Sequence, residues 1–447
     1  MVNTMTGAAV PSATGAGRCA DLGDTAAMVL AGPPSTDGPE PLAAHRARVG
    51  APAGHTADEI LTEIRASGLR GRGGGGFPLW RKLETARQAD LLTGREPLVV
   101  INCSESEPAS RKDWMLCSYR PHTVLDGAAA IAKGLSARHV VIHLHSDASR
   151  PRMALRHAIE ERASEKDDPR WRVSLGPGGY VSGEASAVAR FLDTGVALPL
   201  FTTAPLAAGA PGGRPTVVSN AETASQVAAL LSVGAARWRA AGSTASPGPH
   251  LVTVSGAVSS PGRVLELVGS VTVGDVLAES GLASPPRAVL VGGYAGTWVR
   301  GEVAWSVPLE AEALKEVHAS LGCGLIGVLP HGECVVALTA RLVGYLARES
   351  AGQCGPCVHG LPVLAQSMAD LAAGTGGRRT LRRLHRCLEE LPGSGACSHP
   401  DGVARLVASL LDVFEDDVAR HRRGTPCASA SAPRSEGFPI PVAGVAR

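Results

Sequence analysis

Strand-like and helix-like segments alternate in the first half of the chain, and this alternation limits the possible folds more than any other feature. Residues 97–102 form a short apolar run typical of a buried strand, and residues 121–135 have helical spacing. A second strand is predicted at 139–145, a helix at 152–165 and a third strand at 171–175. This order is typical of a doubly wound α/β sheet with parallel strands.

The ends of the predicted strands carry the polar loops. SESEP follows the first strand, and GPGGYVSGE follows the third. Ligands of such sheets bind beyond the carboxyl ends of the strands. We therefore expect a binding site where these two loops meet.

With 447 residues, the chain is too long for one core. Ala, Gly, Pro, Ser and Thr dominate the start without apolar periodicity, which predicts a disordered leader. A linker-like stretch, AAGSTASPGP, ends the α/β part, and a hairpin with a turn at Pro261 and Gly262 and a short helix follow it. The predicted parts are a leader at 1–45, an α/β domain at 46–240, a small α+β domain at 248–325, a helical domain at 326–423 and a polar tail at 424–447.

Bulk properties exclude several classes of function. The formal net charge is +2 and the basic residues form no stripe, so we expect no nucleic-acid partner. No segment is suited to cross a bilayer or to act as a signal peptide, so we expect a cytoplasmic protein without membrane insertion. Ten cysteines are too few for a disulfide scaffold in a chain of this length.

A glycine-rich loop, SGLRGRGGGGFP, precedes the first strand. Its glycines would let the backbone approach a phosphate, and Arg70 and Arg72 would add positive potential. The loop lacks the Gly-Lys-Ser/Thr ending of a nucleoside triphosphate site and the spacing of a dinucleotide fingerprint. By composition alone, a flexible loop explains it equally well.

Three later motifs accompany this loop: INCSESEP, GPGGYVSGEASA and GGRPTVVSNAET. Together with SGLRGRGGGGFPLWRK and in the same order, they resemble the NADH-binding flavoprotein subunit of respiratory complex I and its relatives in NAD-linked hydrogenases and formate dehydrogenases. The similarity covers roughly residues 60–420. It implies a Rossmann-like flavin-binding domain, then a soluble-ligand-binding β-grasp domain that serves as a spacer, then a helical bundle with an Fe–S site.

The resemblance also implies site residues. Those expected to bind FMN are Gly71, Gly73, Lys82, Asn102, Glu105, Tyr180, Gly183, Glu184, Ser219 and Asn220, with Ala221 as a further possibility. Those expected near NAD(P)H are Phe77, Glu107 and Phe201. Hydride would pass from NAD(P)H to FMN, and single electrons would leave through an Fe–S cluster. The flavin carries this chemistry, so no protein nucleophile is required.

Several positions depart from the family pattern. The second Glu of the family's G-E-E is Ala185 here, and a carboxylate at that position normally repels a 2′-phosphate, so NADPH becomes admissible beside NADH. Ser104, Ser219 and Leu198 replace an Asp, an Asn and a Lys of the family. These changes leave the phosphate loop intact.

The cysteine motif ESAGQCGPCVHG resembles the family's cluster motif, and GACSHPDG supplies its distant cysteine. Cys354, Cys357 and Cys397 give three thiolates, but the fourth family cysteine is Ala351. A 4Fe–4S cluster with a non-standard fourth ligand, a 3Fe–4S cluster and a lost cluster all remain open. Candidates for the fourth ligand are Cys387, Cys427, His359, His399 and Ser350.

Three functions are therefore compared. The first is an NAD(P)H dehydrogenase subunit that passes electrons to a partner protein such as a ferredoxin-like or thioredoxin-like Fe–S subunit, and that can dock onto a membrane complex. The second is a non-catalytic scaffold of a redox assembly, suggested by Ala185, Ala351 and Ser104. The third is a binding protein stabilised by zinc at Cys354, Cys357, Cys397 and His399.

Overall fold

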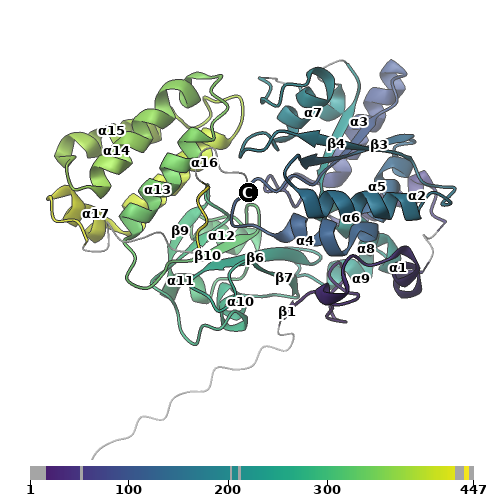
Figure 1. The fold of residues 1–447 in the computed structure, drawn as a ribbon, viewed down its shortest axis with the longest axis horizontal. Coiled ribbons are helices and arrows are strands. Elements are labelled where there is room, and N and C mark those ends of the chain that lie inside the picture. Colours follow the sequence, from purple (N-terminus) through teal and green to yellow (C-terminus); the bar gives the residue numbers. More distant parts are fainter. Residues whose placement is uncertain (1–16, 51–53, 202–203, 210–212, 428–436, 442–447) are drawn as a thin grey trace, which may run out of the picture.

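The computed structural model describes residues 17–50, 54–201, 204–209, 213–427 and 437–441. It contains two β-sheets and a helical region, and Figure 1 shows the three parts meeting near the middle of the molecule. In these ranges no helix has the length and apolar character needed to cross a membrane.

The first sheet is parallel, and its strand order is β4, β3, β2, β5. Its strands are β2 (Leu98–Asn102), β3 (His139–His145), β4 (Arg170–Gly176) and β5 (Thr216–Asn220). All four strands are parallel and helices connect them, so the predicted α/β class is confirmed.

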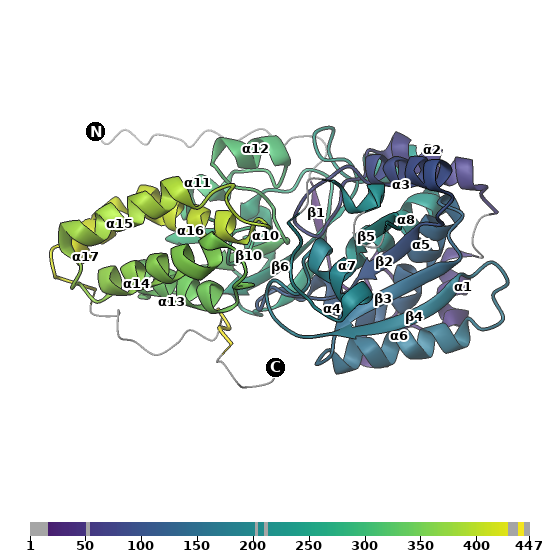
Figure 2. The ribbon, with the colours of Figure 1, turned by 90° about the horizontal axis from the view of Figure 1, so that it is seen from above.

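Helices cover both faces of this sheet (Figure 2). They are α2 (Ala57–Ser67), α3 (Leu79–Thr93), α4 (Lys112–Tyr119), α5 (Pro121–Gly134), α6 (Ser149–Glu161), α7 (Ala185–Thr194), α8 (Ala221–Val233) and α9 (Ala235–Ala240). Side chains of a strand alternate between the two faces. Val99 and Ile101 accordingly pack in the core with α5 and α8, whereas Val100 packs with Val188 of α7 on the opposite face.

The second sheet has six strands in the order β1, β7, β6, β10, β8, β9. These are β1 (Arg18–Ala20), β6 (His250–Gly256), β7 (Arg263–Val268), β8 (Ala288–Val291), β9 (Thr297–Arg300) and β10 (Leu325–Val328), with α10 (Val273–Glu279), α11 (Gly301–Trp305) and α12 (Ala311–Glu316). The hairpin β6–β7 and the short helix after it confirm the prediction for this part. Since β10 pairs with both β6 and β8, the sheet continues past residue 325, where the small domain was predicted to end.

The third part is helical. It consists of α13 (Val335–Arg348), a π-helical turn (Pro356–Gly360), α14 (Leu361–Ala372), α15 (Gly377–Glu390), α16 (His399–Val413) and α17 (Glu415–Arg422). Helix α15 shows why these segments pack as helices: Thr380, Leu384, Cys387 and Leu391 are buried at helical spacing, while the arginines between them are exposed.

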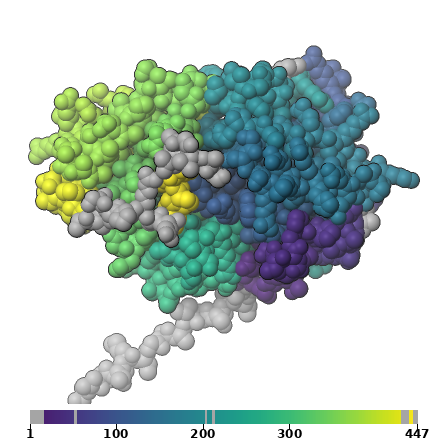
Figure 3. Space-filling model, viewed as in Figure 1, coloured from purple at the N-terminus to yellow at the C-terminus, as the bar shows by residue number. Residues whose placement is uncertain are grey.

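The prediction of a disordered leader is wrong for residues 17–45. Strand β1 pairs with β7, and the buried Glu266 carboxylate accepts hydrogen bonds from the backbone N–H groups of Met28, Val29 and Leu30. A 3₁₀ turn (Ser35–Asp37) and α1 (Leu42–Val49) follow. Figure 3 shows this segment, in purple, lying against the body of the protein. Hydrogen bonds to its backbone and the buried side chains of Val29 and Leu30 hold it, and these leave no periodic apolar signal in the sequence. Residues 1–16 lie outside the described residues.

The predicted tail at 424–447 also contains a packed segment. The carbonyl of Gly437 accepts hydrogen bonds from Gly256 N (2.9 Å) and Ser255 Oγ (2.6 Å). The Phe438 ring is buried, with its centroid 6.2 Å from Tyr294 and 6.4 Å from Trp298. These hydrogen bonds and the buried Phe438 ring fix the described residues 437–441 to the second sheet. Residues 428–436 and 442–447 lie outside the described residues.

Candidate functional site

The glycine-rich loop joins α2 to α3 and closes on itself at its base. Gly71 N donates to Phe77 O at 2.8 Å, and Leu79 N donates to Leu69 O at 3.0 Å. Gly74 has φ of +102°, which a residue with a side chain rarely adopts. The tip of the loop is exposed, so its backbone is available to a ligand.

The two arginines of the loop are already engaged. Arg70 Nε donates to Gly76 O at 2.7 Å within the loop. The Arg72 guanidinium donates to Pro249 O (3.1 Å) and contacts His250 of the second sheet. Burial lowers the pKa of Arg72 to about 10, which leaves it charged at neutral pH. Both arginines therefore add positive potential as expected, but Arg72 also joins the loop to the second sheet.

The carboxyl ends of β2 and β5 bring two predicted residues together. Asn102 and Asn220 are partners in the parallel register, so they end adjacent strands at the same edge of the sheet. A Cβ added to Gly73 would lie 3.1 Å from Asn220 Cβ, which places the glycine loop against this edge. Lys82 Nζ donates to Val218 O at 2.8 Å, two residues before Asn220.

The loop after β4 reaches the same place. Asn102 Nδ2 donates to Gly183 O at 2.7 Å. A Cβ on Gly183 would lie 2.6 Å from Ser106 Oγ and 3.4 Å from Ser104 Cβ. A side chain at position 183 would require Ser106 to move, so glycine suits this close approach, and all four motifs meet at the edge where a doubly wound sheet binds its ligand.

Two predicted carboxylates stabilise helix N-termini. Glu105 Oε2 accepts from Asp113 N (2.8 Å) and Trp114 N (3.0 Å) at the start of α4. Burial and the neighbouring Asp113 carboxylate raise the pKa of Glu105 to about 7. Glu184 Oε2 accepts from Ser186 N and Ala187 N at the start of α7. Their contact with a flavin stays a prediction.

An ionic cluster beside Asn220 escaped the sequence analysis. Lys112, which is 2% exposed, places Nζ at 3.1 Å from Asp113 Oδ1, 3.0 Å from Glu222 Oε2 and 3.3 Å from Asn220 Oδ1. Burial lowers the pKa of Lys112, but the surrounding carboxylates outweigh it and raise the pKa. The only sequence signal was an Arg-Lys-Asp triplet in a loop, which is usually solvated.

The second sheet contributes to the site, although we expected it to be a spacer. Tyr180 Oη donates to Glu107 Oε2 at 3.2 Å, and the same oxygen accepts from Tyr294 N at 2.9 Å. A Cβ on Gly293 would lie 2.7 Å from Glu107 Oε2 and 2.8 Å from Cys323 Sγ. The loops after β8 and before β10 therefore close over Glu107. Sequence spacing could not reveal this contact between distant segments.

The remaining predicted residues differ in exposure. Phe77 is 51% exposed at the base of the glycine loop, and Phe201 is 81% exposed. Ser219 is buried within β5 and pairs in register with Ile101. The exposed rings can face a ligand that comes from solvent. Ser219 is buried one residue before the end of β5, so it can contact only a ligand that binds at that end of the strand.

The three predicted cluster cysteines lie near one another. Burial, together with the Cys354 and Cys397 thiols, raises the pKa of Cys357 to about 11. Among the described residues their sulfur atoms do not form a group within 4.8 Å of one another, as the donors of a single ion would. Each thiolate of an Fe–S cluster binds its own iron atom, so its cysteines stand farther apart. The three thiols thus suit a cluster better than one zinc ion.

His399, two residues after Cys397, has one ring nitrogen that could bind a metal ion. Its Nε2 lies 2.8 Å from Leu346 O, which identifies Nε2 as the protonated nitrogen. Its Nδ1 is buried and has no hydrogen-bond partner among the described residues. The His399 ring centroid lies 5.4 Å from that of Tyr180. Tyr180 therefore stands between the Glu107 site and the cysteine site.

Comparisons with known proteins agree with this arrangement. The Nuo51 FMN-binding domain matches residues 64–229, and the NADH-ubiquinone oxidoreductase-F iron-sulfur binding region matches residues 337–421. The F subunit of NADH-quinone oxidoreductase from Streptomyces coelicolor is 30% identical over 383 residues, which cover 83% of this chain and 84% of that protein. The corresponding Escherichia coli protein is 29% identical over 382 residues, 81% of this chain and 84% of that protein.

A solved structure is also similar. An NAD+-reducing NiFe hydrogenase in the H2-reduced state superposes with a TM-score of 0.75 at 29% identity, covering 85% of this chain. The match spans 64% of the hydrogenase chain. Fold, site and matched regions thus define a redox protein with an FMN-binding α/β domain and an Fe–S binding helical region. The chain belongs to the family of NADH-quinone oxidoreductase F subunits.

Proposed function

We propose that this chain is the electron-input subunit of an NAD(P)H oxidoreductase. The observation that carries the proposal is the meeting of Gly73, Asn102, Gly183 and Asn220 at one edge of the parallel sheet. When bound, FMN would supply hydride acceptance and an Fe–S cluster would supply single-electron transfer. The chain's own residues bind and orient these groups.

The residues at the edge of the sheet fit a flavin phosphate and ring. The exposed glycine tip and Lys82 would hold the phosphate end, since backbone N–H groups and a nearby cation favour an anion. Asn102 and Asn220 would orient the ring by hydrogen bonds. Lys112 is not a proposed flavin contact. It neutralises Asp113 and Glu222 beside Asn220. Burial lowers the pKa of Lys82, which is consistent with a cation kept partly desolvated.

The nicotinamide cofactor would enter from the exposed side of the glycine loop. Phe77, Phe201 and Glu107 are its proposed contacts, and Tyr180 and Tyr294 hold the Glu107 carboxylate by hydrogen bonds. At the position where the family has an acidic residue, the chain has Ala185 at the start of α7. Without that charge, a 2′-phosphate is repelled less than in the family, so NADPH is a proposed substrate beside NADH.

The cysteine site would hold the cluster through Cys354, Cys357 and Cys397. Of the candidates for a fourth ligand, His399 is the one whose unpartnered ring nitrogen supports that role. Cys427 is unsuitable, because its neighbour His421 contacts the carbonyls of Leu371 and Ala372 at the far end of α14. Electrons would leave to a partner Fe–S subunit of ferredoxin-like or thioredoxin-like type.

The proposed domains follow the sheets: 46–240 for FMN and NAD(P)H, 248 to the end of β10 for the β-grasp part, and the following helices to residue 423 for the cluster. A non-catalytic scaffold would share this fold. We therefore favour activity because the glycine-rich loop keeps the family pattern and the four motifs meet at one edge of the sheet, rather than because of the fold.

One experiment tests the proposal. The protein is purified without oxygen and reconstituted with FMN, and its absorbance is recorded before and after NADH or NADPH, with iron and sulfide quantified. We expect bound flavin that either nicotinamide bleaches, and at least three irons per chain. Absence of flavin after reconstitution would refute the proposed function. Bound flavin that neither nicotinamide bleaches would favour the scaffold.

A further inference from the structure

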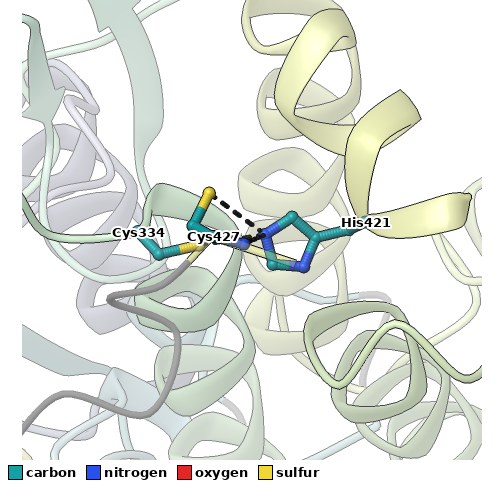
Figure 4. A group of neighbouring side chains, drawn as sticks. All are labelled: Cys334, His421 and Cys427. Atoms are coloured by element: carbon teal, nitrogen blue, oxygen red, sulfur yellow. Dashed lines mark hydrogen bonds between the residues drawn. The ribbon is translucent and has the colours of Figure 1, made fainter. Parts of the chain in front are cut away.

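Cys334, His421 and Cys427 form a second group of metal-ligand type, outside the site described above (Figure 4). Their ligand atoms all lie within 4.8 Å of one another. His421 Nε2 is 3.2 Å from Cys334 Sγ and 3.4 Å from Cys427 Sγ. These distances suit donors around one ion, in contrast to the wider spacing of the cluster cysteines.

The orientation of His421 is fixed by the protein. Its Nδ1 lies 3.2 Å from Leu371 O and 3.0 Å from Ala372 O, the last carbonyls of α14. Two carbonyls can only accept, so Nδ1 carries the proton and Nε2 holds the lone pair. A histidine that donates its other N–H to a carbonyl is the usual arrangement of a metal-ligating imidazole.

More hydrogen-bond donors surround Nε2 of His421 than its single lone pair can accept. It faces the Cys334 and Cys427 thiols and also receives the Cys427 backbone N–H at 3.3 Å. Thiols are weak hydrogen-bond donors, so little is gained from these contacts. A cation bound to both sulfurs and to Nε2 would replace three weak interactions by three coordinate bonds.

Cys334 is a buried thiol whose pKa burial and the Cys427 thiol raise to about 11, and the start of a helix opposes only part of this shift. Cys334 caps the N-terminus of α13, and its Sγ accepts from Ala337 N at 3.5 Å. A helix N-terminus stabilises a negative charge. Cys334 and His421 are buried, whereas Cys427 is partly exposed, so the site has one accessible side.

That accessible side borders a cavity of about 620 Å³ between α13 and α14. Cys427, Ala337 and Ala372 are among the residues that line it. Solvent in this cavity can supply the fourth ligand of a tetrahedral ion.

The group is separate from the Fe–S site. Cys357 lies in the π-helical turn before α14, and His421 contacts the other end of α14. At a rise of 1.5 Å per residue, the two sites are about 20 Å apart. One cluster cannot use ligands from both.

We propose that Cys334, His421 and Cys427 bind one thiophilic divalent ion, with zinc as the preferred metal and solvent as the fourth ligand. Two thiolates and an imidazole are soft to borderline ligands, which favour zinc over magnesium or calcium. The ion joins the start of α13 to α17 and to the segment after it, and the hydrogen bonds of His421 link it to the end of α14. It therefore stabilises the helical region by binding only its folded form.

The test uses the full-length protein with its Fe–S cluster reconstituted, so that Cys354, Cys357 and Cys397 are occupied, and titrates it with zinc against a competing chromophoric chelator. We expect one tight zinc per chain, and a zinc-edge X-ray absorption spectrum with two sulfur neighbours and at least one nitrogen. The zinc edge reports on zinc alone, so iron at the cluster site does not interfere.

The test variants are Cys427→Ser, whose side chain is partly exposed, and His421→Gln. Each should weaken zinc binding by at least about tenfold, as expected for the loss of a ligand. Cys19→Ser changes a partly exposed thiol of β1, outside the helical region, and serves as the matched control, with zinc binding unchanged. Near-equal zinc binding by Cys427→Ser and the unchanged protein would overturn the proposal, as would a Cys334–Cys427 disulfide that persists in samples kept under a reductant. Iron content reports on the proposed function separately.

Discussion

The hydroxyl of Tyr180 donates a 3.2 Å hydrogen bond to Glu107 Oε2, and its ring lies 5.4 Å from that of His399. One aromatic side chain thus touches a proposed nicotinamide-side carboxylate and a residue of the cysteine site. Burial and Glu107 raise the pKa of Tyr180, so the phenol stays protonated and remains a donor. The two sites are therefore in direct contact through protein atoms.

Replacing Tyr180 by Phe should slow the reduction of the flavin by the nicotinamide more than it weakens FMN binding, because the aromatic ring is kept and only the hydroxyl is lost. Loss of the hydroxyl takes one hydrogen-bond donor away from the buried Glu107 carboxylate. Such a loss costs about 1 to 3 kcal/mol and loosens the position of the carboxylate. We expect a roughly tenfold lower kcat/KM for NAD(P)H. Stopped-flow absorbance measures it, and Tyr119→Phe in α4 is the control. Equal rates in both variants would contradict the role of this contact.

Gly73→Ala should weaken FMN binding, because the new Cβ would lie 3.1 Å from Asn220 Cβ and displace that side chain. We expect roughly tenfold weaker binding, about 1.4 kcal/mol. Gly75→Ala is the matched control, since a Cβ there would meet nothing within 4 Å. Flavin fluorescence titration measures both. A larger effect at Gly75 would move the phosphate toward the tip of the loop.

Lys112→Met should destabilise the folded protein strongly. It would leave Asp113 and Glu222 buried without their cation, and breaking such a network by removing one partner costs about 3 to 5 kcal/mol. Urea unfolding of the flavin-free protein measures the change. Lys133→Met, at an exposed position of α5, should have little effect. Similar midpoints for the two variants would show that the network is not stabilising.

Glu266 should make stability fall as the pH rises. Burial raises its pKa to about 7 from an ordinary 4.5, so the folded chain binds a proton that the unfolded chain has lost between these values. The contribution is complete below pH 4.5 and is lost toward pH 7, by up to about 3 kcal/mol.

Unfolding free energies from pH 4.5 to 7.5 check this expectation. Glu266→Gln should flatten the curve relative to the unchanged protein, whereas Glu302→Gln, at an exposed position, should leave its slope as it was. The same slope in all three proteins would mean that Glu266 is ionised throughout, held by the N–H groups of residues 28–30.

His399→Ala should make the protein lose iron to a chelator roughly tenfold faster, if His399 is the fourth ligand. In an Ala351→Cys background, which restores the family's fourth cysteine, the same substitution should have little effect on iron loss. Iron release followed by absorbance, with iron and sulfide per chain, gives the comparison. Equal sensitivity in both backgrounds would assign His399 a packing role only.

Much of the fold followed from local pattern. The runs at 97–102 and 139–145 are buried β2 and β3, and the hairpin and short helix after residue 248 occur where they were predicted. The alternation of buried and exposed residues within an element depends on neighbouring positions of the sequence, so these elements could be predicted from the sequence. The loops after the first and third predicted strands likewise meet, as expected, because the carboxyl ends of parallel strands share an edge.

Tertiary structure alone decided the partners of the charged and polar groups. It paired Lys112 with Glu222, held residues 28–30 on Glu266, and placed Tyr294 on Glu107. It also brought Cys334 to His421 and Cys427 across more than eighty positions of sequence. Periodicity reports only which face of an element is buried. Which distant groups meet there depends on how the two sheets and the helices pack, and no local pattern records that.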